Sequence, residues 1–141
     1  TKDDIRSFIN CVASATDGKE FFSVYQLRKE GFRHTLLDAG LDEWFYSSLL
    51  AEDRERFSYR RMGGTRLFSR TGEVSRSKFI EYIVNNTMDK LADVRELEKC
   101  LFSEYGIGIS RYKIAETTKD TEMFYNPVSG IIYADATLCD N

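Results

Sequence analysis

Two segments that alternate apolar and polar residues around glycine constrain the fold more than any other feature of this chain. The first, FSYRRMGGTRLF at residues 57–68, has Gly63 and Gly64 between its two halves. Alternation on both sides of a Gly-Gly pair is typical of a β-hairpin. The second, MFYNPVSGIIYA at residues 123–134, is a less charged version with Gly130 near its turn. We therefore expect a β-hairpin in each half of the chain.

Helical patterning precedes each hairpin. Ile5, Phe8, Ile9 and Val12 form one helical stripe in residues 3–15. Before the first hairpin, Ser23 is expected to cap a short helix ending near residue 30, and Asp42 a helix to about residue 51, whereas residues 32–39 are ambiguous. Before the second hairpin, the expected helices begin after Ser75, Asp93 and Ser110.

The two halves can be superimposed as sequences. Phe8 and Val12 recur as Phe79 and Ile83, 71 residues later, and Gly64 recurs as Gly130. Amphipathic helices share such spacing by chance, but the shared order of elements favours a duplication into units of about 70 residues. We expect a mainly α protein with small β-hairpins, of the α+β class, divided into residues 1–72 and 73–141.

The order of three helices and a hairpin, present twice, resembles tandem winged helix-turn-helix domains of bacterial regulatory, DNA-binding proteins. The resemblance covers nearly the whole chain. It implies that residues 42–52 and 110–119 are the recognition helices, which enter the DNA major groove in this class. It also implies that the two hairpins are wings that touch the DNA backbone or minor groove.

The first hairpin lies in the most basic segment of a chain whose formal net charge is −3. Residues 54–78 hold eight arginines and lysines against two acids, a net charge of +6, so the rest of the chain has −9. Arginine matches phosphate oxygens and releases counterions on binding. Tyr59 and Phe68 interleave with the cluster and are suited to stack on exposed bases. The alternative is that these arginines pair with acids elsewhere in the chain or on a protein partner.

The two expected recognition helices differ in charge. The first presents Glu43 and Glu52, which repel phosphate, together with Ser47 and Ser48, and its aromatic residues Trp44 and Tyr46 are expected in the core. The second is richer in basic and hydroxyl side chains and is better suited to a DNA groove. The expected nucleic-acid-binding residues are Arg56, Arg60, Arg61, Arg66, Arg70, Arg111, Lys113, Thr117 and Lys119.

Other functional classes find little support in the sequence. The motifs of common hydrolases, nucleotide-binding loops and zinc proteases are absent, so we expect no enzymatic activity, no cofactor and no metal site. Cys11, Cys100 and Cys139 lack zinc-binding spacing and are expected as reduced thiols of a cytoplasmic protein, the first two on apolar helix faces. The sequence contains no apolar run long enough to span a membrane. Because the chain begins without methionine, we expect a fragment of a larger protein.

Together these features predict a nucleic-acid-binding module of a larger regulatory protein, with double-stranded DNA as its ligand. In this prediction the basic hairpin contacts phosphate and the second recognition helix lies in the groove. The alternative is a module for protein–protein interaction or dimerisation that uses the winged-helix fold without binding DNA, because a fold does not determine a function.

Overall fold

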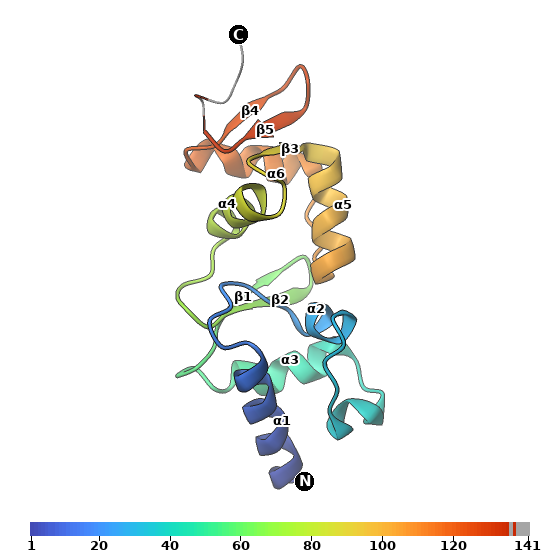
Figure 1. The fold of residues 1–141 in the computed structure, drawn as a ribbon. Coiled ribbons are helices and arrows are strands. Elements are labelled where there is room, and N and C mark those ends of the chain that lie inside the picture. Colours follow the sequence, from blue (N-terminus) through green and yellow to red (C-terminus); the bar gives the residue numbers. More distant parts are fainter. Residues whose placement is uncertain (136, 138–141) are drawn as a thin grey trace. The chain divides into compact units, whose positions relative to one another are not determined.

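The computed structural model describes residues 1–135 and 137, and its helices and two small antiparallel sheets confirm the α+β class (Figure 1). The chain divides into two compact units. The first unit contains Thr1–Val74 together with Glu104–Gly106. The second unit contains Ser75–Ser103 and the described residues from Ile107 onward.

The helices of the first unit begin where the sequence places capping side chains. Ser23 accepts a hydrogen bond from the backbone N–H of Gln26, and Asp42 accepts one from Phe45, so each side chain satisfies a free donor of a helix start. Residues 32–39, which the sequence leaves ambiguous, contain a short 3₁₀-helix. The elements are α1 (Lys2–Ala15), α2 (Val24–Lys29), η1 (Thr35–Ala39), α3 (Glu43–Ala51), β1 (Ser58–Met62) and β2 (Thr65–Ser69).

The second unit has the same kind of construction. Ser75 caps α4 and Ser110 caps α6, each by accepting a hydrogen bond from a backbone N–H of the first turn. Its elements are α4 (Arg76–Asn86), β3 (Leu91–Asp93), α5 (Val94–Tyr105), α6 (Arg111–Thr117), η2 (Thr118–Asp120), β4 (Phe124–Asn126) and β5 (Ile131–Tyr133).

A short extended segment before the second helix of each unit was not expected from the sequence. In the first unit, Phe22 forms an antiparallel bridge with Phe68 of β2. In the second unit, β3 pairs antiparallel with β5, and the sheet order is β3-β5-β4. Each unit therefore runs helix, short extended segment, helix, helix, hairpin, and in each the short segment pairs with the last strand of the hairpin.

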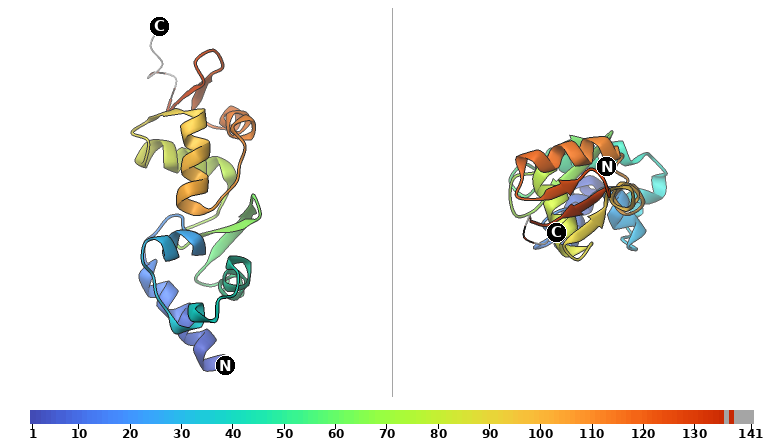
Figure 2. Two further views of the ribbon diagram at one scale, coloured as in Figure 1. Left: turned by 90° about the vertical axis from the view of Figure 1, so that its right-hand side faces the viewer. Right: turned by 90° about the horizontal axis from the view of Figure 1, so that it is seen from above.

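The first hairpin has the two-residue turn that its glycines predict. Met62 pairs with Thr65, which leaves Gly63 and Gly64 as the turn, and Gly64 has a positive φ of 80°. The register also places Arg61 opposite Arg66. Two like charges directly opposite one another destabilise a sheet unless other groups compensate for them. Figure 2 shows this hairpin, in green, beside α3 of the same unit.

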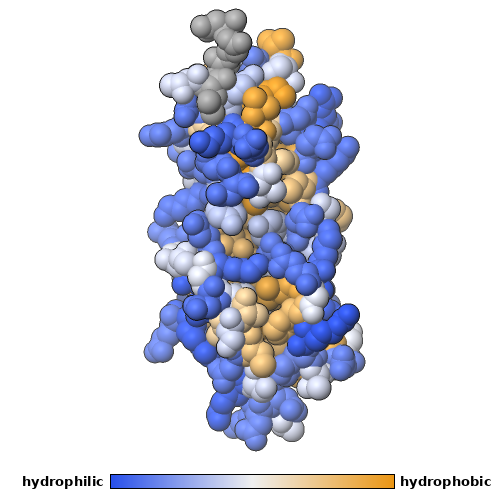
Figure 3. All heavy atoms as spheres, viewed as in Figure 1, coloured by the Kyte–Doolittle hydropathy of each residue, from blue (hydrophilic) through white to orange (hydrophobic). Residues whose placement is uncertain are grey.

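The surface seen in Figure 3 is largely hydrophilic, and apolar side chains gather in patches on it. No helix within residues 1–135 is both long and apolar enough to cross a membrane.

Cys11 is exposed, and its expected place on an apolar face was wrong, because the buried stripe of α1 runs through Phe8, Val12 and Ala13. Cys139 lies outside the described residues.

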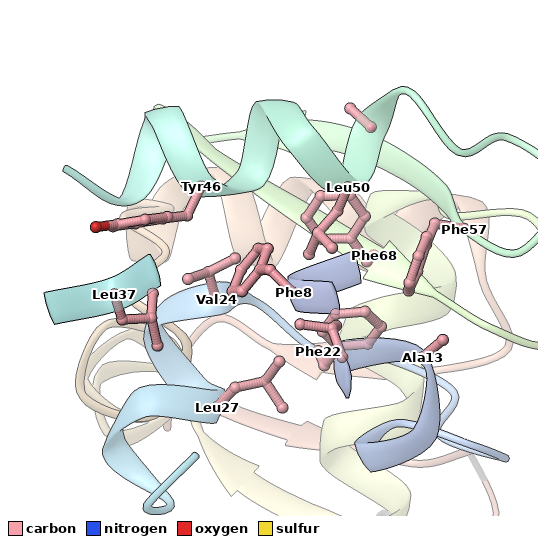
Figure 4. Packing of buried hydrophobic residues seen from close by; sticks show 12 residues of the cluster. Phe8, Ala13, Phe22, Val24, Leu27, Leu37, Tyr46, Leu50, Phe57 and Phe68 are labelled. Carbon is pink, nitrogen blue, oxygen red and sulfur yellow. The ribbon is translucent and has the colours of Figure 1, made fainter. Parts of the chain in front are cut away.

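The core of the first unit combines aromatic and aliphatic side chains (Figure 4). Phe22 and Phe68 are fully buried, and their stacked rings lie 5.4 Å apart. Phe8 of α1 meets Tyr46 of α3 with 5.9 Å between ring centroids. Complete burial of such a side chain contributes about 2 kcal/mol. The core therefore joins α1, α3 and the hairpin, and so positions the surface formed by α3 and the hairpin.

Candidate nucleic-acid interface

Arginine and aromatic side chains alternate along the surface between α3 and the first hairpin. We call Arg54, Tyr59, Arg66, Trp44 and Arg61 the arginine–aromatic ladder. The guanidinium of Arg54 lies 5.8 Å from the Tyr59 ring centroid, and that of Arg66 lies 5.7 Å from the same ring. Arg66 and Arg61 then lie 3.5 Å and 5.2 Å from the Trp44 ring. Distances in this range are those of cation–π interactions.

Arg66 ties the hairpin to the first turns of α3. Its Nη1 donates hydrogen bonds to the carbonyl oxygen of Trp44, at 3.1 Å, and to Oγ of Ser47, at 2.8 Å. Its guanidinium also stacks on the Trp44 ring. The indole thus gives the adjacent arginines Arg61 and Arg66 a shared electron-rich partner, which explains how two like charges are tolerated across the hairpin.

The expectation that Trp44 belongs to the core was wrong, whereas Tyr46 is fully buried as expected. Trp44 is 41% exposed and its neighbour Phe45 is 37% exposed. At about 100° per residue, the stripe that contains Tyr46 and Leu50 cannot also include Trp44. One signal could have revealed this arrangement. The segment EWFYSSLLA has more large apolar residues than one stripe can hold, so some of them must face outward.

The expected binding residues of the first unit fall into two groups. Arg60 and Arg61 are exposed on β1, and no carboxylate among the described residues of the first unit forms an ion pair with them or with Arg66. Arg56 is exposed but pairs with Asp53, Nε to Oδ2, at 2.6 Å. Arg60 and Arg61 are therefore available to an external anion without breaking a hydrogen bond or ion pair of the fold, whereas Arg66 is bonded to Trp44 and Ser47.

Arg70 faces inward. Its Nη1 donates to the carbonyl oxygen of Ala13 at the end of α1 and, at 3.2 Å, to Oγ1 of the buried Thr16. Its guanidinium also lies 5.3 Å from the ring centroid of Phe57. A cation near the last carbonyls of a helix is favourable. Arg70 therefore attaches the end of the hairpin to α1.

The acidic side chains of α3 are less repulsive than the sequence suggests. The Nη1 of Arg28 lies 3.2 Å and 3.1 Å from the two carboxylate oxygens of Glu43, so this charge is neutralised within the unit. Glu52 is exposed. Ser47 was expected to be exposed but is buried, because it lies under the hairpin and accepts the hydrogen bond of Arg66.

The second unit offers a smaller basic surface. Lys113 and Lys119 are exposed, whereas Arg111 is half-buried with its guanidinium 5.4 Å from the exposed Tyr112 ring. Thr117 is buried, and its hydroxyl donates to the carbonyl oxygen of Lys113 at 2.7 Å. Of the four expected residues in this region, the two lysines are the most accessible to a ligand.

A groove of about 610 Å³ lies beside α6 in the second unit. Its lining includes Tyr112, Lys119, Met123 and Phe124. Tyr112 is 74% exposed, and Val128 at the tip of the second hairpin is 95% exposed. Apolar side chains are visible over this hairpin in Figure 3. The groove thus combines aromatic surface with one basic and one acidic side chain, those of Lys119 and Glu116.

The residues that the structure describes contain no cluster of three or more His, Cys, Asp or Glu side chains arranged to hold a metal ion.

The backbone N–H of Arg95 donates to Asp93 and lowers the pKa of that carboxyl. The hydroxyl of Thr1 donates to Asp4 and lowers its pKa in the same way. Helix-start geometry explains both shifts.

Neither a family model, nor a curated protein, nor a solved structure matches this chain.

Proposed function

We propose that the chain consists of two tandem winged-helix units and binds nucleic acid, with double-stranded DNA as its ligand. In this proposal it is a module of a larger cytoplasmic regulatory protein. Support for the fold assignment comes from the order of elements, because each unit contains three helices followed by a hairpin. In both units a short segment before the second helix also pairs with the last strand of the hairpin, which is consistent with two related units.

The observation that carries the DNA proposal is the state of the hairpin arginines. Arg60, Arg61 and Arg66 form no ion pair with a carboxylate among the described residues of the first unit. They belong to a segment of net charge +6 in a chain of net charge −3. Such a concentration of arginine favours phosphate, whose oxygens accept paired hydrogen bonds from the guanidinium fork.

The two units contribute differently in this proposal. The first contributes its hairpin, with Arg60 and Arg61 on phosphate oxygens. The second contributes α6 and the turn after it, with Lys113 and Lys119 near the DNA backbone or groove. Arg70 and Thr117 have internal roles, and we leave them out of the proposed contact surface.

The proposal is tested by measuring the binding of a blunt DNA duplex at several salt concentrations. Each phosphate contact adds about 0.9 to the slope of log affinity against log salt, so the double variant Arg60→Ala/Arg61→Ala should lower that slope by about 1.8. Arg6→Ala/Arg33→Ala removes the same charge from exposed positions outside the hairpin and serves as the matched control. If both double variants keep the wild-type slope, the hairpin does not contact phosphate.

A second function is favoured by the groove of the second unit. Aromatic and apolar side chains as exposed as Tyr112 and Val128 are typical of protein interfaces. In this alternative the chain docks on a protein or on a second copy of itself. Sizing the protein across a dilution series tests dimerisation: a dimer dissociates on dilution, and Tyr112→Ser/Val128→Ser should shift that transition to higher protein concentration. A constant monomer mass at all concentrations excludes the dimer.

A further inference from the structure

The outward surface of α3 is poor in groups that read base edges. Base-pair readout in the major groove uses side chains such as Arg, Asn, Gln and Ser. On α3, Ser47 is buried and bonded to Arg66, and Glu43 is paired with Arg28. The most exposed large side chains are instead Trp44 and Phe45. A helix with this surface is poorly suited to hydrogen bonding with paired bases.

Trp44 is nevertheless held in a defined position. Arg66 stacks on its ring at 3.5 Å and bonds to its backbone carbonyl, so Arg66 is a positioning residue for the indole. With the guanidinium in place, 41% of Trp44 remains exposed. A rigid, partly covered aromatic ring loses little conformational entropy when another flat ring stacks on it.

We infer that Trp44 is a stacking platform for an unpaired base, so that the preferred ligand is duplex DNA with a single-stranded extension. This inference rests on the proposed function and specifies its ligand. Exposed aromatic rings next to arginines are the combination that binds single-stranded nucleic acid: rings stack on bases, and the positive groove follows the phosphates. Here Arg61 and Arg66, which face each other across the hairpin, lie over the Trp44 ring and supply the charge.

Charge complementarity favours a nucleic acid over an apolar protein segment as the occupant. The exposed aromatic pair is bordered by Arg61 and Arg66, which lack carboxylate partners among the described residues of their unit. An apolar partner would leave these two guanidinium groups without a counter-charge at its edge. A single strand offers one phosphate for each base and so satisfies the charge and the ring together.

Trp44 is the single tryptophan of the chain, so its fluorescence reports on this position alone. The experiment compares a blunt duplex with a duplex that is two base pairs shorter and has a four-nucleotide extension, so that both contain the same number of phosphates. Binding is followed with labelled DNA and, separately, by the quenching of Trp44. We expect about tenfold tighter binding of the extended duplex. We also expect Trp44 to be quenched by the extended duplex and unchanged by the blunt one.

Variants separate stacking from charge. Trp44→Ala should abolish the preference for the extended duplex, whereas Trp44→Phe, which keeps an aromatic ring beside Arg66, should retain most of that preference and the wild-type affinity for blunt duplex. Phe102→Ala removes another exposed aromatic ring, 65% exposed on α5, and should leave the preference intact. If Trp44→Ala and Phe102→Ala lose the preference for the extended duplex to the same extent, a specific role for Trp44 is overturned.

The remaining outcomes distinguish this inference from the function beneath it. If both duplexes bind with equal affinity and Trp44 fluorescence does not change, the inference fails while DNA binding stands. If neither duplex binds at low salt, the proposed function fails and the inference fails with it. Quenching of Trp44 by polyglutamate, together with no binding of either labelled duplex, overturns both and supports an acidic protein partner.

Discussion

The guanidinium carbon of Arg66 lies 3.5 Å from the centroid of the Trp44 ring, so strand β2 and helix α3 share one cation–π contact. The same guanidinium donates to the Trp44 carbonyl and to Ser47. Stacking and two directed hydrogen bonds at once require a planar group with several N–H donors, which arginine has and lysine lacks. The contact therefore explains why an arginine stands at this position opposite Arg61.

Replacing this arginine tests its structural role. Arg66→Lys keeps the charge but loses the planar stack and at least one hydrogen bond, so the free energy of unfolding should fall by about 1–2 kcal/mol. Urea unfolding followed by circular dichroism measures the change. Arg60→Lys, on the opposite face of the same hairpin, is the control and should stay within about 0.5 kcal/mol of wild type. Equal free energies of unfolding for Arg66→Lys and Arg60→Lys would contradict a specific role for Arg66.

Arg70 should affect stability without affecting binding. Arg70→Met keeps much of the apolar stem but removes the donors to the carbonyl of Ala13 and to Thr16, so unfolding should become easier by about 2 kcal/mol. The salt dependence of duplex binding should equal that of wild type, because Arg70 makes no proposed phosphate contact. Arg60→Ala should instead lower the salt slope of duplex binding and leave the free energy of unfolding nearly unchanged. A reduced salt slope in Arg70→Met would return this arginine to the contact surface.

Local signals predicted much of the fold. Ser23, Asp42, Ser75 and Ser110 cap the helices that they were expected to cap, because an N-cap depends on neighbours within one turn. The extended segments at Phe22 and at β3 were missed. They are too short to show alternation, and their extended form depends on pairing with the last strand of a hairpin.

The candidate site was less predictable than the fold. Sequence shows where positive charge concentrates, but the roles of Arg66 and Arg70 depend on the helix that each one meets. The exposure of Trp44 likewise depends on which face of α3 the hairpin covers. These are tertiary outcomes, and residue spacing along one segment does not determine them.

The turn of the first hairpin gives a prediction about backbone strain alone. Gly64 has a positive φ of 80°, and a Cβ built there meets no atom within 4 Å. Gly64→Ala should therefore lower stability by about 1–2 kcal/mol through strain and without any clash. Gly72 is the matched control, since a Cβ there also meets open space and its φ lies outside the left-handed region. Thermal melts measure the stability of both variants. In them Gly72→Ala should be neutral or slightly stabilising. Equal losses in both variants would contradict the strain argument.

The helix start at Asp93 predicts how stability depends on acid. The backbone N–H of Arg95 donates to the Asp93 carboxylate at 2.8 Å and lowers the pKa of this group from its ordinary value in the folded protein. A carboxyl with a lowered folded pKa stabilises the fold above its unfolded pKa of about 3.9, and the contribution is lost as the pH falls through the folded pKa. Asp93→Asn keeps an oxygen that can accept the same bond but cannot titrate.

We therefore expect Asp93→Asn to be slightly less stable than wild type near neutral pH. Its free energy of unfolding should fall less steeply than that of wild type as the pH decreases from about 5 to about 2. Urea unfolding at several pH values measures both curves. Glu122→Gln, which neutralises an exposed acid outside any helix start, should leave the wild-type pH dependence nearly unchanged. Parallel curves for wild type and Asp93→Asn would show that this carboxylate does not contribute to acid sensitivity.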